Sequence, residues 1–180
     1  MNFYQIVLFL HILGAVGLFL GLGIEGTVLK SLTRISTTKE VLSWISSLKL
    51  LRITFAISTV LLLLAGIYMV IEAWNWTGWV IMGLIILVAL SGLGNMTGKK
   101  LGDIFKSLSG SDGSLSTEIK EKLSAPFLIK AFKTKIFIVA GTIFIMTMKT
   151  DWLGSIAAIV VAFLLGLLIS GVSGKGQEST

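Results

Sequence analysis

The sequence predicts an all-α integral membrane protein. We expect a bundle of five transmembrane helices in a single domain over residues 1–180, with the amino terminus outside and the carboxyl terminus in the cytoplasm. The chain is 54% hydrophobic and only 13% charged, whereas soluble domains are about 25% charged. Its apolar residues gather in runs long enough to cross a bilayer core of about 30 Å. Its basic residues are distributed asymmetrically between the segments that connect those runs.

Five apolar segments define the expected architecture. We predict spans at residues 3–24, 53–71, 77–96, 126–148 and 152–172, with cytoplasmic loops at 25–52 and 97–125. The fourth span has the weakest pattern, because its uninterrupted apolar run, residues 136–148, is too short to cross the core. It becomes a full span if Lys130, Lys133 and Lys135 extend toward the headgroups, and the alternative is a buried or half-spanning segment. Pro126 marks its start.

The basic residues set the expected orientation. Fourteen of the 15 belong to the two long loops, the start of the fourth span or the tail, and Lys149 is the exception. Because cytoplasmic segments carry the excess of lysine and arginine, both long loops are expected in the cytoplasm. The same bias accounts for the net charge of +6, so we expect the lipid bilayer as a partner and no nucleic acid. Aromatic residues predict an outer belt: Tyr4, Trp74, Trp76, Trp79 and Trp152.

The two long loops are expected to be partly helical. Thr37 and Glu40 have the spacing of a capping box, and the apolar residues from Val41 onward recur at helical spacing. This pattern predicts an amphipathic lead-in to the second span, either on the membrane surface or continuous with the span. In the second loop, residues 109–113 predict a flexible break, and residues 115–123 a short, solvated, charged helix.

Small residues mark the faces where helices are expected to pack. In the first span, Gly14, Gly17 and Gly21 lie on one helical face and would allow another helix to approach closely. The last span carries a ladder of small residues at a spacing of four: Gly154, Ala158, Ala162, Gly166, Ser170 and Gly174. The ladder predicts a packing seam, whose partner is either another helix of this chain or a second subunit.

The candidate functional residues are ionisable or polar side chains within the apolar segments. His11 is the only histidine and lies on the glycine face of the first span, where we expect a serine, threonine or tyrosine partner, or Glu72 through water. A candidate polar cluster comprises His11, Glu25, Tyr68, Glu72 and Asn95. Glu25 is expected at the inner end, near Arg52 and Lys135 in depth. The structural alternative is that these residues serve as hydrogen-bonding contacts between helices.

Catalytic and cofactor motifs are not found in the sequence. The chain has no cysteine, so it offers neither a thiolate metal site nor a cysteine nucleophile. A single histidine excludes bis-histidine haem ligation, although His11 with a methionine could still ligate haem. We therefore predict a protein that is not an enzyme, with no metal and no cofactor, and His11 as the one residue able to bind a cofactor.

Two short segments carry a family resemblance. Leu10-His11-Ile12-Leu13-Gly14-Ala15 resembles the first helix of a group of uncharacterised bacterial integral membrane proteins, which are similar to the membrane domain of copper-resistance D-type proteins. Met146-Thr147-Met148-Lys149, followed by Trp152-Leu153-Gly154-Ser155, resembles the last hairpin of that group. The resemblance implies a bacterial inner-membrane protein and carries over only His11 as a functional position.

These observations leave three functional hypotheses. The leading one is a small membrane subunit or scaffold that packs against itself or a membrane protein partner through its small-residue faces. The first alternative is a transporter or proton-conducting protein that uses His11 and the polar helix faces, and the second is a protein that handles haem or copper. A polar cavity that reaches the membrane midplane would favour transport, and tightly sealed helix faces would favour the subunit.

Overall fold

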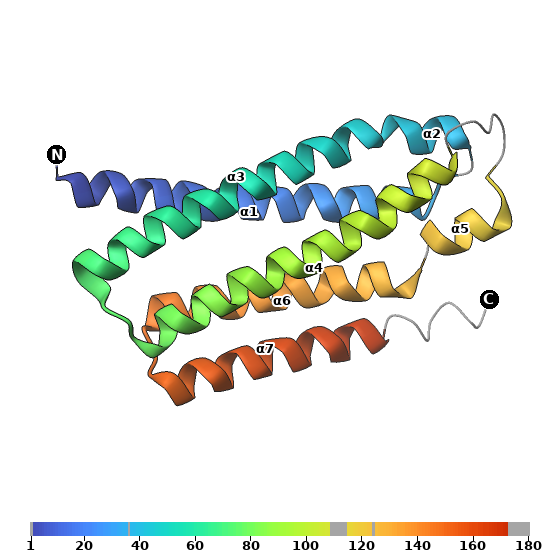
Figure 1. Ribbon diagram of the computed structural model, residues 1–180. Coiled ribbons are helices and arrows are strands. Elements are labelled where there is room, and N and C mark those ends of the chain that lie inside the picture. The colour runs from blue at the N-terminus through green and yellow to red at the C-terminus, as the bar shows by residue number, and fades with distance from the viewer. Residues whose placement is uncertain (1, 36, 109–114, 124, 173–180) are drawn as a thin grey trace.

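The described chain is a bundle of long, roughly aligned helices. The computed structural model describes residues 2–35, 37–108, 115–123 and 125–172, and the regular structure within these residues is helical. Its elements are α1 (Phe3–Leu32), α2 (Thr38–Ser43), α3 (Ile45–Met69), the π-helical turn η1 (Val70–Trp74), α4 (Gly78–Leu108), α5 (Thr117–Leu123), α6 (Pro126–Met148) and α7 (Trp152–Val172). The short helices α2 and α5 lie together at one end (Figure 1). The predicted all-helical class is confirmed.

Within the described part of the chain, four stretches of helix are long and apolar enough to cross a membrane. They are Phe3–Leu32, Thr38–Trp74, Gly78–Lys106 and Trp152–Ser170, and they overlap the predicted first, second, third and fifth spans. α6 is not among them. It nevertheless has 23 residues, begins and ends at the predicted positions and runs alongside the other long helices (Figure 1).

The segments predicted as partly helical loops, residues 25–52 and 97–125, are helical over much of their described length. α1 continues to Leu32 and α4 to Leu108, well past the predicted span ends. Their additional turns carry apolar side chains that are buried together with Val41 of α2 and Leu123 of α5. An isolated helix end in water would leave these side chains exposed. Packing against α2 and α5 buries them, so both helices continue beyond the apolar runs. Residues 109–113, predicted as a break, lie outside the described residues.

The short helices agree with their sequence signals. The Glu40 amide donates to Thr37 Oγ1 at 3.4 Å, and the Thr37 amide donates to Glu40 Oε2 at 3.3 Å, which confirms the capping box. α2 leads almost directly into α3, with Val41 fully buried, so the lead-in packs against protein. In α5, a hydrogen bond from Lys122 and its positive charge lower the pKa of Glu118. Both side chains are exposed, as expected for a solvated helix.

The glycine face of α1 packs against α3, as predicted. A Cβ atom added at Gly14 would lie 3.0 Å from Leu62 Cγ, and one added at Gly17 would collide with Ser58 Oγ. A phenylalanine ring of α3 covers Gly21 at the next turn. The absence of side chains at these three positions is therefore what lets the two helices approach.

The small-residue ladder of α7 packs against α6 of the same chain. A Cβ added at Gly141 of α6 would lie 2.8 Å from the Ala162 Cβ, and one added at Gly166 would lie 2.9 Å from the Thr134 Cα. The Ala158 carbonyl also faces Gly141. The sequence did not decide whether the ladder packs against this chain or a second subunit. Along this part of the seam its partner is α6.

The ends of the ladder have other roles. The Gly154 amide donates to Asp151 Oδ1 at 2.8 Å, which caps the start of α7. Ser170 is buried and its hydroxyl donates to the Gly166 carbonyl at 2.5 Å. Gly174, the last predicted member, lies outside the described residues.

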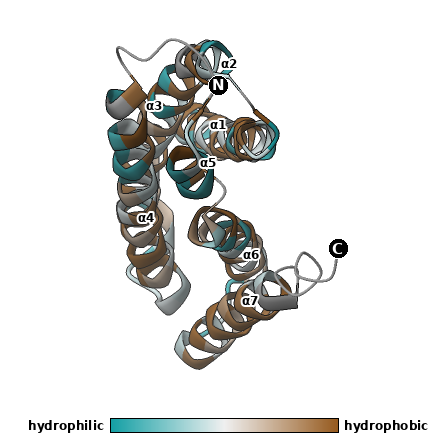
Figure 2. Ribbon diagram, turned by 90° about the vertical axis from the view of Figure 1, so that its right-hand side faces the viewer, coloured by the Kyte–Doolittle hydropathy of each residue, from teal (hydrophilic) through white to brown (hydrophobic). Residues whose placement is uncertain are grey.

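The long helices form two layers. Seen from the end (Figure 2), α3 and α4 lie on one side, while α1 and α6 lie on the other, with α7 next to α6. α3 packs against α1, and α4 against α6. α3 and α4 follow each other in sequence, and residues of both helices line the site described next.

Candidate functional site

A cavity of about 620 Å³ lies between α3 and α4, with α1 and α6 behind it. Its walls are largely apolar, and its charged residues gather toward the end where α2 and α5 lie. The apolar lining includes Leu18, Leu22, Phe55, Val60, Leu87 and Leu90, and the charged and polar lining includes Glu25, Lys49, Arg52, Asn95, Thr97 and Lys135. The cavity is a groove rather than a sealed void, because lining residues such as Val60, 53% exposed, also face the outside of the bundle.

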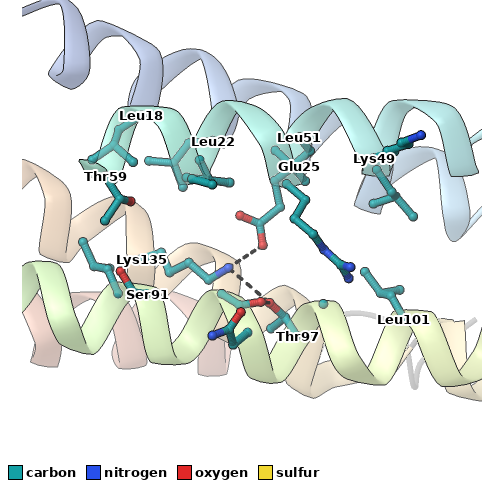
Figure 3. A pocket seen from close by; sticks show the side chains of 18 of the residues that line it. Leu18, Leu22, Glu25, Lys49, Leu51, Thr59, Ser91, Thr97, Leu101 and Lys135 are labelled. Atoms are coloured by element: carbon teal, nitrogen blue, oxygen red, sulfur yellow. Dashed lines mark hydrogen bonds and ion pairs between the residues drawn. The ribbon is translucent and has the colours of Figure 1, made fainter. Parts of the chain in front are cut away.

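A buried ion pair forms the floor of the groove. Lys135 of α6 donates to Glu25 Oε1 of α1, and the two residues are only 4% and 6% exposed. Lys135 Nζ also lies 3.5 Å from Thr97 Oγ1 of α4. Figure 3 shows the two charged side chains pointing toward each other in the space between α3 and α4. Three helices that are distant in sequence thus meet at this point.

The position of the pair follows from the pattern of apolar residues. Lys135 lies between Phe132, which packs on the apolar cluster around α2 and α5, and Ile138, which belongs to a second apolar cluster. It is about 20 Å along α6 from Met148, at about 1.5 Å per residue. A buried charge is costly unless it is paired. Glu25 supplies that pairing from α1.

One oxygen of the floor carboxylate is unpaired. Glu25 Oε2 is buried and accepts no hydrogen bond from any residue that the structure describes. A buried acceptor without a donor costs about 1–3 kcal/mol, more for a charged group. Because Glu25 lines the groove, a donor would reach this buried oxygen from the groove, once a small rotation of the carboxylate exposes it.

Arg52 stands where the charged end of the groove meets α4. Its Nη2 lies 3.6 Å from where a Cβ would stand on Gly98, so the guanidinium reaches from α3 across to α4. Within the described ranges it forms no ion pair with a carboxylate. The charged lining residues are three cations, Lys49, Arg52 and Lys135, and one carboxylate, Glu25, so their net charge is +2.

The structure separates the five residues of the predicted polar cluster. Glu25 and Asn95 line the same groove. Tyr68 lies near the other end of the bundle, where its ring meets Phe3 edge-on at 5.2 Å. Glu72 is exposed. The five therefore do not form one polar path, because residues that share a helical face can still lie at opposite ends of it.

His11 belongs to an aromatic environment. Its ring meets Trp74 edge-on with centroids 6.2 Å apart, and its Nδ1 lies 3.6 Å from where a Cβ would stand on Gly66. Nδ1 is buried and makes no hydrogen bond within the described part of the chain. No serine, threonine or tyrosine of the described chain, and not Glu72, forms the expected hydrogen bond with His11 Nδ1. The π-helical turn that ends α3 brings Trp74 to this position.

The inward orientation of Lys135 was not predicted. The sequence pattern favoured a lysine that extends toward the headgroups, whereas the side chain is buried against Glu25. The shared depth of Glu25, Arg52 and Lys135 was predicted, and that signal was sufficient to suggest the pairing. Thr97 carried no signal, because a threonine at a span end is common. Among the described residues, no group of three or more histidine, aspartate or glutamate residues is arranged to hold a metal ion.

Comparison with known proteins finds no matching family model, no similar curated protein and no similar solved structure. The site is therefore interpreted from its own geometry and chemistry.

Proposed function

We propose that this chain is a multi-pass protein of a bacterial inner membrane that binds an amphipathic molecule in the groove between α3 and α4. All five long helices would span the bilayer, with the amino terminus outside and the end that carries α2 and α5 in the cytoplasm. The charge bias of the sequence supports this orientation, and the short motifs in α1 and at the turn between α6 and α7 support the bacterial family.

The groove itself is the observation that carries the proposal. A subunit that served only to pack would close its helices against each other, as α1 closes on α3 and α6 on α7. α3 and α4 instead leave about 620 Å³ between them, within the range of about 300–1,000 Å³ typical of ligand sites. This difference favours the ligand-handling class, which includes the transporter alternative, over the sealed subunit.

The distribution of polarity in the groove supports an amphipathic occupant. Charged side chains lie at one end, and apolar side chains such as Phe55, Val60 and Leu87 line the remainder. Val60 also faces the surface that would meet lipid. A molecule could therefore enter sideways from the bilayer, with its polar end near Arg52 and its apolar part along α3 and α4.

The proposal assigns the central role to Glu25 and Lys135 rather than to His11. The buried pair lies in the groove, whereas His11 packs on Trp74 and Gly66. His11 then contributes to the packing of α1 on α3. A homo-oligomer or membrane protein partner remains a further proposal, which the exposed apolar faces of α7 support.

The test is photo-crosslinking in vesicles that contain a phospholipid with a diazirine in its acyl chain. Adducts should concentrate on Val60 and Leu87 of the groove relative to Leu168, an exposed residue of α7. Gly94→Leu should reduce the groove adducts, because Gly94 lines the groove and an added Cβ meets no atom within 4 Å. Gly92→Leu is the matched control, since Gly92 is equally unobstructed but does not line the groove.

Equal labelling of the groove and of Leu168, unchanged by Gly94→Leu, would contradict the proposal. In that case α3 and α4 would be covered by bulk lipid alone, and the subunit hypothesis would be preferred. Both substitutions replace a helical glycine with a better helix former, worth up to about 1 kcal/mol. Loss of fold is therefore not expected to complicate the comparison.

A further inference from the structure

We infer that the occupant of the groove is an anionic phospholipid whose headgroup carries a hydroxyl group. The inference rests on the proposed function and adds the chemical class of the ligand. In this arrangement Arg52 binds the phosphodiester, and the headgroup hydroxyl donates to Glu25 Oε2. Three properties of the groove lead to it: its net charge, its one unpaired acceptor and its apolar wall.

The net charge of the lining selects an anion. Lys49, Arg52 and Lys135 outnumber the single carboxylate of Glu25, and Lys135 is already engaged by that carboxylate. The guanidinium of Arg52 has no carboxylate partner among the described residues. Its planar fork of N–H donors matches the oxygens of a phosphate group. A monoanionic phosphodiester would therefore offset part of the excess positive charge and pair Arg52.

The unpaired oxygen of Glu25 selects a neutral donor. Oε2 is buried and without a partner in the described chain, so a ligand that donates a hydrogen bond there removes an existing cost. An ammonium headgroup could donate as well. It would, however, lie beside Lys135 Nζ, which occupies the other oxygen of the same carboxylate, and like charges at this separation repel. A hydroxyl donates without adding a second cation.

The apolar wall selects a lipid over a soluble phosphate. Leu22, Phe55 and Leu90 line the groove next to the charged end, and a free headgroup would leave this surface uncovered. The first part of an acyl chain would cover it, at roughly 25 cal/mol for each Å² removed from water. Because the groove is open at the side, the remainder of the chains can stay in the bilayer.

A matched pair of lipids tests the hydroxyl contact without any substitution. Phosphatidylglycerol and phosphatidylmethanol carry the same charge and can carry the same chains, but only the first has headgroup hydroxyls. The full-length protein, in a neutral detergent, is mixed with equal amounts of both, and the two one-to-one adducts are quantified by native mass spectrometry. We expect phosphatidylglycerol to be preferred by about tenfold, which corresponds to a single hydrogen bond to a charged group.

Variants separate the two contacts. Arg52→Gln should weaken binding of both anionic lipids by about tenfold or more, whereas Arg34→Gln, a control arginine that does not line the groove, should not. The double variant Glu25→Leu/Lys135→Met should bind both lipids equally, because it lacks the accepting oxygen. It replaces the buried pair with apolar residues, an exchange that folded proteins commonly tolerate.

The outcomes distinguish this inference from the proposed function. Equal binding of the two lipids by the unmodified protein, with both displaced by Gly94→Leu, overturns the hydroxyl contact and leaves the lipid groove intact. Preference for phosphatidylethanolamine over phosphatidylglycerol overturns the anionic assignment. Competition by free glycerol phosphate at lipid-equivalent concentration overturns the lipid source. No adduct that responds to Gly94→Leu overturns the groove itself, and with it the proposed function.

Discussion

The buried pair of Glu25 and Lys135 provides the sharpest energetic prediction. Replacing Lys135 with methionine leaves the Glu25 carboxylate buried with neither oxygen paired, since Oε2 has no partner within the described residues even in the native protein. Replacing Glu25 with leucine leaves the ammonium with only a 3.5 Å contact to Thr97 Oγ1. Breaking a buried pair from one side typically costs about 3–5 kcal/mol. We expect each single substitution to fall in this range.

The double substitution should cost far less than either single one. Glu25→Leu/Lys135→Met removes both charges together, and an apolar replacement of similar volume is often neutral or stabilising. We expect a free energy of unfolding within about 1 kcal/mol of the native value. The sum of the two single destabilisations should therefore exceed the destabilisation of the double variant by several kcal/mol. Such non-additivity identifies a direct interaction between the two residues.

The assay is equilibrium unfolding of the full-length protein in mixed micelles with increasing sodium dodecyl sulfate, followed by circular dichroism. Lys130→Met is the matched control, because Lys130 lies on the same helix but is exposed, and its substitution should change stability by less than about 0.5 kcal/mol. Additive single costs in the cycle, or a Lys135→Met variant as stable as Lys130→Met, would refute the reasoning.

Three further predictions concern packing, His11 and topology. Gly166→Leu should destabilise the protein by about 1–3 kcal/mol through overpacking against α6, while the exposed control Leu167→Ile should be mild; equal melting temperatures would contradict the seam. His11→Gln should fold normally, and neither form should show a Soret band in its absorption spectrum; a native band that the variant loses would instead indicate haem. In intact spheroplasts an impermeant thiol reagent should label Thr77→Cys but not Thr33→Cys, and the reverse pattern would invert the proposed orientation.

The bounds of α6 and α7 were predicted correctly because they are set by residues close to the helix ends. Pro126 sets the start of α6, and the short turn before Trp152 sets the start of α7, so both helices have the predicted bounds. Spacing alone also identified the packing faces, because the absence of side chains at Gly17 and Gly166 is a property of the sequence itself. Their partners, α3 and α6, required the structure.

Features that depend on tertiary packing were not predictable in the same way. The continuation of α1 and α4 beyond the apolar runs was not predicted, because Val28 and Leu108 are buried by residues of other helices. The sequence pattern predicted that the Lys135 side chain extends toward the headgroups. The pairing was not predicted, because its partner, Glu25, lies 110 residues away along the chain. The groove has no local signature in the sequence, since its lining residues come from α1, α3, α4 and α6.

The most direct test of the groove is the mass of whatever stays bound when the full-length protein is extracted from its native membrane. Native mass spectrometry of the unmodified protein and of Gly92→Leu should show one retained adduct with the mass of an anionic phospholipid. Gly94→Leu, which fills the groove, should lose that adduct while keeping its fold. Identical spectra for all three proteins would contradict the account, because the groove would then hold nothing that its own side chains select.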